Sequence, residues 1–262
     1  MTDAAAPTER FSNRVGDYVR HRPGYPAGLV AWLHGTQGID AGLQVADVGA
    51  GTGISTRMWH GAGHEVVAVE PNAAMREAGM AGFTGDPRVR WVAGSAEATT
   101  LADASVDVVS AAQAFHWFDP APTRAEWTRV LRPGGLAVLL WNLRAVDRSP
   151  LMAEYEALQH AHGIDYARVA ERHPDDDAIA RWYGVGLRAT ASFPHVQRLD
   201  FDGLLGRLLS SSWAPQAGHP EYAPMVEALR ALFDRHAVDG RVDFDYDARA
   251  FVGTLPDIST TR

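Results

Sequence analysis

The first half of the chain consists of short apolar runs separated by helical stretches. The runs lie at residues 45–48, 65–70, 89–93, 106–112 and 137–141. Each has the length of a buried strand, and strands that alternate with helices form a parallel sheet with helices on both faces. We therefore expect a doubly wound α/β fold up to about Asn142, with a ligand at the carboxyl edge of the sheet.

The pattern changes after Asn142. Residues 143–194 contain a helical stretch at 151–161 and a charged stretch, but no convincing strand. Beyond them, residues 196–201 alternate like a strand, 221–236 have helical spacing, and 242–252 alternate again. We interpret these as the closing elements of a Rossmann-like sheet of about seven strands, with the last strand antiparallel and a helical cap inserted before them.

A glycine-rich turn follows the first apolar run. Gly49, Gly51 and Gly53 alternate there, which permits positive φ angles and a close approach of the backbone to a ligand. A helix begins at Ile54, and its first amides are expected to face the ligand. Glu70 ends the next strand, where ribose hydroxyls bind in doubly wound sheets, and its carboxylate can accept two hydrogen bonds. The combination predicts a nucleoside site.

The glycine spacing discriminates between nucleoside ligands. A dinucleotide fold has G-x-G-x-x-G, whereas the third glycine here, Gly53, comes one residue early, so pyrophosphate binding is disfavoured. The pattern D-x-G-x-G-x-G that starts at Asp47 resembles motif I of the class I S-adenosylmethionine (SAM) dependent methyltransferases. Their cofactor carries no phosphate.

Further segments carry the same resemblance over roughly the first half of the chain. Residues 94–97 follow the third strand, where this family places its adenine contacts. The sequence Gln-Ala-Phe-His-Trp-Phe at 113–118 is similar to a bacterial small-molecule, type 11-like subgroup. Residues 131–136 form the characteristic turn before the fifth strand, where Pro133 stops the helix.

Residues 18–26 resemble the amino-terminal element Tyr-x-x-x-Arg-Pro-x-Tyr-Pro that closes over SAM in related enzymes. The resemblance implies that Tyr18 and Arg22 contact the cofactor, since a guanidinium suits the methionine carboxylate. For Arg22 alone, a solvated arginine on a surface helix is the alternative.

The resemblance implies SAM as cofactor, S-adenosylhomocysteine as product, and the following cofactor-binding residues: Tyr18, Arg22, Asp47, Gly49, Ala50, Gly51, Gly53, Glu70, Pro71, Ser95, Ala96, Glu97 and Gln113.

One position departs from the family. Many relatives have an aspartate after the third strand that accepts from the adenine amino group, and this chain has Ser95-Ala96-Glu97. Either Glu97 takes over that contact, or Ser95 and the Ala96 amide read the adenine edge; a solvent-exposed Glu97 that starts a helix is the third possibility.

Methyl transfer from a sulfonium is an in-line displacement, so the protein mainly aligns the reactants and excludes water. A general base is optional. The candidate is His116, which follows the fourth strand near the expected methyl position, although a histidine beside Trp117 can equally pack there structurally. We expect no metal site, because His160 and His162 diverge on a helix and no second ligand pair has recognisable spacing.

Composition limits the kinds of partner that we expect for this chain. The chain has 262 residues, a net charge of −8 and no cysteine. No block of basic residues is present to neutralise several phosphates, which opposes extended nucleic-acid binding and favours a small-molecule substrate. No apolar run reaches membrane-spanning length, and the amino terminus lacks the features of a signal peptide, so we expect no membrane partner and a cytoplasmic location. The oligomeric state stays open.

These observations predict one domain in four parts: an amino-terminal helical lid over the cofactor (1–40), a SAM-binding α/β core (41–142), a helical cap over the active site (143–195), and closing strands and helices (196–262). The predicted function is transfer of a methyl group from SAM to an O, N or C atom of a small organic molecule. A SAM-binding protein of the same fold that transfers no methyl group is the alternative, followed by an RNA methyltransferase.

Overall fold

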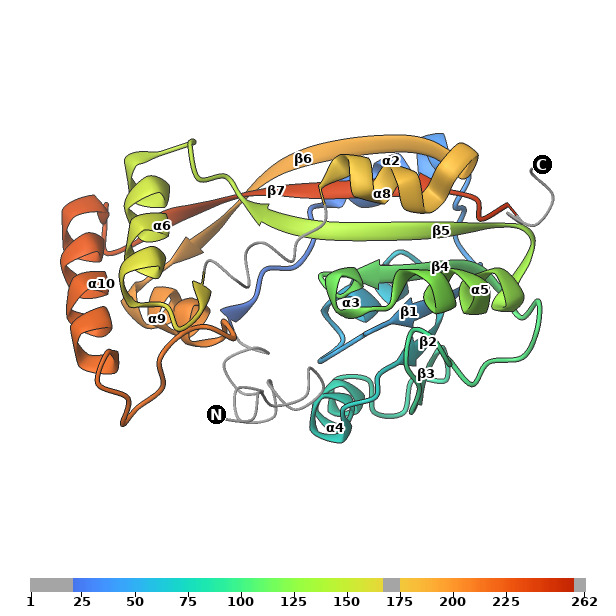
Figure 1. The fold of residues 1–262 in the computed structure, drawn as a ribbon, viewed down its shortest axis with the longest axis horizontal. Coiled ribbons are helices and arrows are strands. Elements are labelled where there is room, and N and C mark those ends of the chain that lie inside the picture. Colours follow the sequence, from blue (N-terminus) through green and yellow to red (C-terminus); the bar gives the residue numbers. More distant parts are fainter. Residues whose placement is uncertain (1–20, 167–174, 257–262) are drawn as a thin grey trace.

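The computed structural model describes residues 21–166 and 175–256. Its centre is a seven-stranded sheet in the order β3-β2-β1-β4-β5-β7-β6 (Figure 1). The pairs among β1 to β5 are parallel, and β7 pairs antiparallel with both β5 and β6. The predicted Rossmann-like α/β sheet with an antiparallel last strand is therefore confirmed.

The strands are β1 (Gln44–Val48), β2 (Glu65–Val69), β3 (Val89–Val92), β4 (Val106–Ala112), β5 (Leu131–Arg144), β6 (Leu187–Leu199) and β7 (Val242–Gly253). The helices of the described ranges are α2 (Ala27–Gln37), α3 (Ile54–Gly61), α4 (Ala73–Ala81), α5 (Pro120–Val130), α6 (Pro150–His162), α8 (Asp176–Tyr183), α9 (Phe201–Leu209) and α10 (Tyr222–His236), with short 3-10 turns η1 (Phe115–Trp117) and η2 (Gly184–Gly186).

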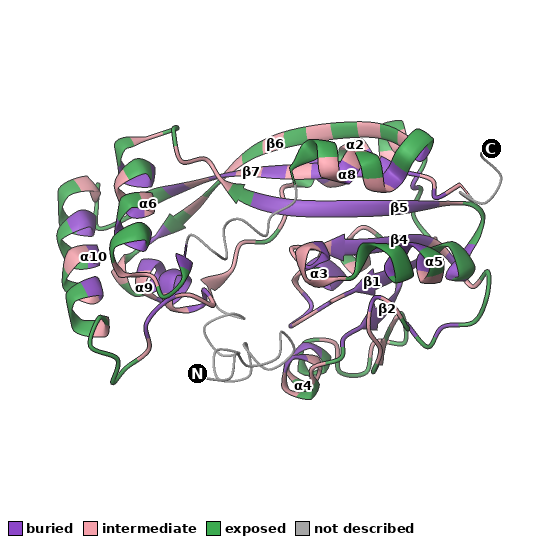
Figure 2. Ribbon diagram, in the orientation of Figure 1, coloured by how far each residue is buried: buried purple, intermediate pink, exposed green. Residues whose placement is uncertain are grey.

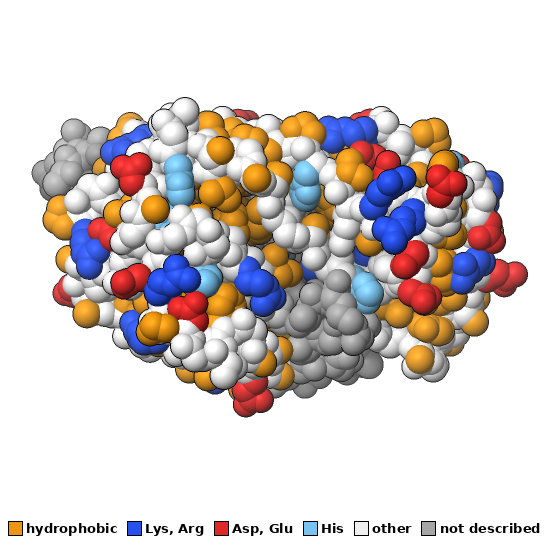
Figure 3. Space-filling model, turned by 180° about the vertical axis from the view of Figure 1, so that it is seen from behind, with side chains coloured by type: hydrophobic (Ala, Val, Ile, Leu, Met, Phe, Trp, Pro, Cys, Tyr) orange, Lys and Arg blue, Asp and Glu red, His pale blue; other side chains and the backbone are white. Residues whose placement is uncertain are grey.

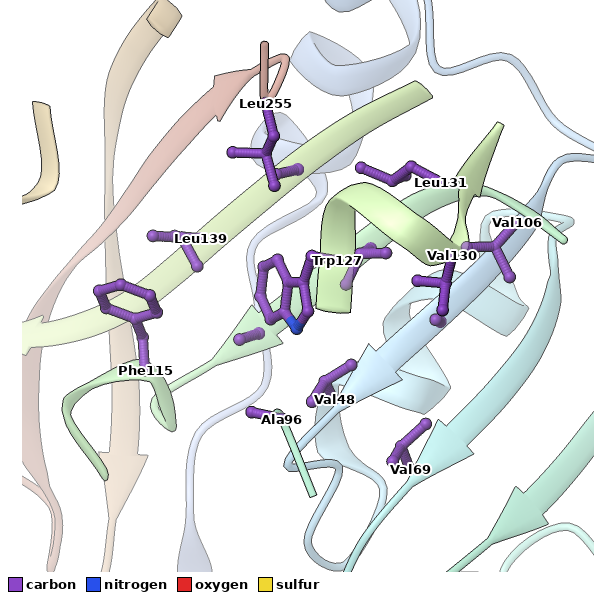
Figure 4. Packing of buried hydrophobic residues seen from close by; sticks show 14 of the residues in the cluster. Val48, Val69, Ala96, Val106, Phe115, Trp127, Val130, Leu131, Leu139 and Leu255 are labelled. Carbon is purple, nitrogen blue, oxygen red and sulfur yellow. The ribbon is translucent and has the colours of Figure 1, made fainter. Parts of the chain in front are cut away.

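Helices cover both faces of the sheet. On one face, Trp127 of α5 packs in a buried cluster with Phe115 and Leu139 (Figure 4). On the other, Leu33 of α2 and Trp59 of α3 belong to a second buried cluster that includes strand residues of β1, β4 and β5. Because alternate residues of a strand point to opposite faces, β5 supplies both clusters and is buried over most of its length (Figure 2).

Three long strands extend the sheet. β5, β6 and β7 have 14, 13 and 12 residues, against 5 in β1 and β2. Their far ends reach α6, α9 and α10 (Figure 1). These three helices and the β7 residues Val242, Phe244 and Tyr246 form a separate buried cluster, which we call the outer lobe. The parallel part of the sheet, with α3, α4 and α5, we call the cofactor half.

The strand predicted at 196–201 exists as the end of β6, but its bounds are wrong. β6 starts nine residues earlier, at Leu187, and Phe201 begins α9 instead of ending a strand. Asp200 caps that helix, because its side chain accepts a hydrogen bond from the Gly203 N–H at 2.8 Å. Pro194 lies inside β6 and is tolerated there because β6 is an edge strand with β7 as its only neighbour. The predicted helices at 151–161 and 221–236 and the strand at 242–252 are confirmed as α6, α10 and β7.

The region predicted as a cap, 143–195, does not pack as one unit. α6 contributes Tyr155 to the outer lobe, whereas α8 contributes Tyr183 to the cluster around Trp127 on the sheet. The Tyr183 hydroxyl donates to the backbone carbonyls of β5 and β7, at Ala137 O and Phe251 O. α8 is thereby fixed to the sheet itself. Of the predicted lid at 1–40, the first twenty residues lie outside the described ranges.

Candidate cofactor site

The glycine turn joins β1 to α3 at the carboxyl edge of the sheet. Gly49, Gly51 and Gly53 have φ angles of +68°, +58° and +84°, which glycine adopts without strain. Some of the amides of the turn bind within the protein: the N–H groups of Gly49 and Ala50 both donate to the Val69 carbonyl of β2. Its contribution to a ligand is therefore close approach of bare backbone rather than a row of hydrogen-bond donors.

Glu70 lies directly after β2 and is only 7% exposed. Its Oε2 accepts from the Gly51 N–H and its Oε1 from the Asn72 N–H, each at 2.8 Å. Burial raises the pKa of the Glu70 carboxyl, and the two backbone donors and Arg76 oppose that rise. Each carboxylate oxygen has a second lone pair. Glu70 thus locks the turn in place and retains capacity to accept from two further hydroxyls.

Two adjoining hollows lie over this edge of the sheet and share Gly49, Gly51, Ala112 and Gln113 in their walls. They enclose about 420 and 860 Å³ of empty space, which includes the solvent at their open mouths. The smaller is further lined by Arg22, Pro23, Tyr25, Ala50, Ile54, Ser55 and Asn142, and the larger by Glu70, Pro71, Asn72, Met75, Ser95, Ala96, Glu97, Ala114, Trp117 and Phe118. We call the two together the cofactor hollow.

Most of the predicted site residues meet in this hollow. Its walls contain Arg22, Gly49, Ala50, Gly51, Glu70, Pro71, Ser95, Ala96, Glu97 and Gln113. Asp47, Gly53 and His116 are not among the lining residues, and Tyr18 lies outside the described residues.

Asp47 is fully buried beneath the turn. Its Oδ2 accepts from the Ser55 and Thr56 hydroxyls, each at 2.7 Å, and these bonds tie the end of β1 to the first turn of α3. Burial raises the pKa of Asp47 to about 6, although the two hydroxyls lower it. Asp47 therefore supports the turn from below instead of lining the hollow.

His116 sits in η1, half-buried, with its ring 4.9 Å from that of Trp117. Its neighbours Trp117 and Phe118 line the hollow, and His116 does not. The η1 turn thus presents aromatic rings to the hollow and holds the histidine beside them.

Glu97 is not a solvated residue at a helix start, because no helix begins at or just after it: the next helical element is η1. Its Oε1 accepts from the Asp119 N–H at 3.0 Å. Burial works against ionisation, but hydrogen bonds from the Asp119 amide and the Ser95 hydroxyl hold the pKa of Glu97 below its usual value. A charged acceptor next to Ser95 and Ala96 faces the larger hollow.

Several lining residues with polar side chains were not among the predicted site residues, and two of them are asparagines. Asn142, near the end of β5, lines the smaller hollow, and Asn72, which caps α4, lines the larger one. The signal for Asn142 was present, since it is a polar residue at the carboxyl end of an apolar strand. Gln113, which was predicted, has an unusual backbone with φ +58°, held by its N–H bond to Leu140 O and by a side-chain bond to Asn142 O.

Residues 21–166 and 175–256 hold no cluster of three or more His, Asp or Glu side chains arranged for a metal ion. In the same ranges, every helix is too short or too polar to cross a lipid bilayer.

The cofactor half of the chain is similar to known proteins. A methyltransferase domain family covers residues 46–139, from β1 into β5. An uncharacterised methyltransferase of Mycobacterium tuberculosis (strain ATCC 25618 / H37Rv) is 43% identical over 134 residues, which are 51% of this chain and 52% of that protein. The chain thus spans about half the length of this relative.

Longer matches extend beyond that half. An uncharacterised methyltransferase of Mycobacterium sp. (strain KMS) is 34% identical over 208 residues, 76% of this chain and 73% of the relative. A solved protein from Anaeromyxobacter dehalogenans, described as a type II methyltransferase, is 26% identical with a TM-score of 0.64, over 89% of this chain and 98% of that one. The motif that starts at Asp47, the fold and these relatives agree, and the chain belongs to the class I SAM-dependent methyltransferase family.

Proposed function

We propose that this protein transfers a methyl group from SAM to an O, N or C atom of a small organic molecule. One observation carries the proposal: two hollows that share part of their walls adjoin at the sheet edge, with a buried carboxylate, Glu70, in the larger and a guanidinium, Arg22, in the smaller. SAM has a ribose diol and an adenine at one end and an amino-acid carboxylate at the other. The donors and acceptors of the hollow match that order.

The larger part fits the adenosine. The remaining lone pairs of Glu70 would accept from the two ribose hydroxyls. Met75, Pro71 and Phe118 provide apolar walls for the adenine ring, and Glu97 with Ser95 provides an acceptor for its amino group. This arrangement supports the first of the two adenine contacts that the sequence left open.

The smaller part fits the methionine end. Arg22 is fixed in direction, because its Nε donates to Ser210 Oγ and its Nη2 to Ser210 O, both at 3.0 Å. A guanidinium held in this way is preorganised to pair with a carboxylate. Ile54 and Ser55 at the amino terminus of α3 also line this part, where the helix dipole favours a negative group.

The sulfonium cofactor supplies the electrophilic methyl and its own leaving group when it is bound. The residues of the chain then have three tasks, which are to hold the cofactor, to orient the acceptor and to exclude water. We keep His116 as the candidate base for acceptors that must lose a proton. His116→Ala is expected to lower kcat and flatten the pH–rate profile while S-adenosylhomocysteine affinity is retained; an unchanged profile and turnover would assign His116 to packing.

A small acceptor is favoured over a nucleic acid by charge. The net charge is −8, and on the face in Figure 3 basic side chains are interspersed with acidic ones. Polyanion binding requires a basic face.

Calorimetric titration with SAM, S-adenosylhomocysteine and NADH tests the cofactor, and S-adenosylhomocysteine release with a panel of small acceptors tests the transfer. We expect micromolar binding of both adenosyl ligands, none of NADH, and turnover with at least one acceptor class. Binding without turnover on any small acceptor would favour a SAM-binding protein that transfers no methyl, and salt-sensitive methylation of RNA would favour an RNA methyltransferase. Absence of adenosyl binding would overturn the proposal.

A further inference from the structure

Three distant parts of the chain meet at Asn142, whose side chain is buried, with the residue 7% exposed. Its Nδ2 donates to Gly24 O at 3.0 Å, and its Oδ1 accepts from His195 Nε2 at 2.9 Å. Its backbone carbonyl accepts from Gln113 Nε2 at 2.9 Å. Gly24 precedes α2, Gln113 follows β4, and His195 lies on β6. The side-chain amide thus connects an edge strand to the segment before α2, and the backbone carbonyl of the same residue holds Gln113; both segments line the cofactor hollow.

The segment before α2 depends on such side-chain contacts. Arg22, Pro23 and Tyr25 line the hollow, but residues 22–26 have no helix or strand structure of their own. Asn142 holds this segment at Gly24 O, and Gln197 of β6 holds it at His21 O, where its Nε2 donates at 3.0 Å. A lining segment without regular structure takes its position from the side chains that bind its carbonyls.

The hydrogen bond to Gly24 O requires one orientation of the Asn142 amide. With the amide reversed, its oxygen would face the Gly24 carbonyl, and two acceptors would repel each other. His195 selects the correct orientation, because an Nε2–H can donate only to the amide oxygen. The His195 ring is in turn fixed by stacking on Tyr246, with ring centroids 5.3 Å apart and an interplanar angle of 22°.

The ionisation of His195 fits this role. Burial lowers the pKa of His195, with an opposing effect from Asp247, and a lowered pKa favours the neutral ring. Two guanidinium groups lie near the stack. Arg207 Nε donates to the Tyr246 hydroxyl at 2.7 Å, and Arg148 pairs with Asp247 at 2.9 Å. A neutral imidazole that donates from Nε2 is the tautomer that the Asn142 contact demands.

We propose that Asn142 and His195 are a pair of positioning residues for the cofactor: His195 orients the Asn142 amide, and Asn142 holds the segment 22–25 against the hollow. The pair acts on SAM and S-adenosylhomocysteine through the placement of Arg22 and Tyr25, not by contact of His195 with the ligand. The inference rests on the proposed function, because it assumes that the hollow binds SAM.

Three variants separate positioning from packing. Asn142→Asp keeps the size but cannot donate to Gly24 O, and we expect its Kd for S-adenosylhomocysteine to rise about 5- to 50-fold. His195→Phe keeps a ring over Tyr246 and removes the donor, and about a 3- to 10-fold rise is expected. His195→Gln restores an N–H donor and should recover most of the affinity. His236→Phe is the matched control, since His236 binds Glu154 in the outer lobe far from the hollow.

A second measurement tests the coupling of the two side chains directly. In Asn142→Asp, the new carboxylate beside the imidazole should raise the pKa of His195. NMR titration of the His195 ring protons measures that pKa. A residue that only fills space would leave that pKa where it is. Melting temperatures within a few degrees of wild type confirm that each variant is folded.

Two failures are distinguishable. If wild type binds S-adenosylhomocysteine and the Asn142→Asp and His195→Phe variants bind it within twofold of wild type, this inference is wrong and the proposed function stands. If wild type does not bind S-adenosylhomocysteine, the proposed function fails first. If His195→Gln binds as poorly as His195→Phe, the donor does not matter and the role of His195 as the orienting group is overturned.

Discussion

The cofactor half and the outer lobe are built from different kinds of contact. In the cofactor half, Glu70 binds amides at Gly51 and Asn72, only 19 and 2 residues away in the sequence. The outer lobe packs α6 against α10 and β7, whose residues are about 60 to 100 positions further along the chain. The family match at 46–139 falls in the cofactor half. The glycine turn and its carboxylate are thus encoded locally, whereas the outer lobe depends on long-range packing, as does Arg22, whose partner Ser210 lies 188 residues away.

The largest expected effect separates stability from cofactor binding. Leu229 of α10 is fully buried in the outer lobe, and Leu229→Ala should lower the free energy of unfolding by about 2–5 kcal/mol. Because no outer-lobe core residue lines the hollow, the Kd for S-adenosylhomocysteine should stay within about twofold of wild type at temperatures where the variant is folded. Chemical denaturation and calorimetry measure the two quantities. A parallel loss of affinity would show that the halves are energetically coupled.

The next effect concerns pH and the support of the glycine turn. The pKa of Asp47 is raised to about 6 in the folded protein, so the protonated carboxyl stabilises the folded state at low pH. This contribution to the free energy of unfolding is lost as the pH rises through about 6. Asn at this position can accept from Ser55 and Thr56 without ionising. Relative to Asp47→Asn, wild type should therefore lose about 3 kcal/mol of unfolding free energy between about pH 4 and pH 7.

Urea titrations of both proteins across that pH range check the prediction. A constant difference between wild type and Asp47→Asn would mean that Asp47 ionises normally despite its burial.

Alanine substitutions at two glycines distinguish the cost of backbone strain from the cost of a close contact. Gly49 and Gly134 both have positive φ, +68° and +82°. A Cβ at Gly49 would lie 2.7 Å from Ala114 Cβ, whereas nothing lies within 4 Å of one at Gly134. Gly134→Ala should cost about 1–2 kcal/mol for the left-handed backbone, and Gly49→Ala about 1–3 kcal/mol more. Equal losses in unfolding free energy would remove the packing argument for Gly49.

Sequence patterns predicted the cofactor half well because its signals are contiguous. The alternation of runs indicated β1, β2 and β4, and the glycine turn and Glu70 stand where the pattern put them. The start of β6 was misplaced because the sequence analysis found no convincing strand before residue 196. Pro194 lies inside β6 and is tolerated there because β6 is an edge strand. The link of Asn142 to Gly24 and His195 was not predictable, since it spans 118 and 53 residues and depends on how β5 and β6 are placed by β7.

Binding of S-adenosylhomocysteine by Glu70→Ala tests the central claim most directly. Glu70 is the buried acceptor for the ribose hydroxyls, and Glu65, at the exposed start of the same strand, supplies a matched control. Calorimetry should show a loss of about 1–3 kcal/mol for Glu70→Ala, roughly 5- to 150-fold in Kd, and no change for Glu65→Ala, with both variants folded. If Glu70→Ala binds S-adenosylhomocysteine as tightly as wild type, the cofactor does not lie along this edge of the sheet as proposed.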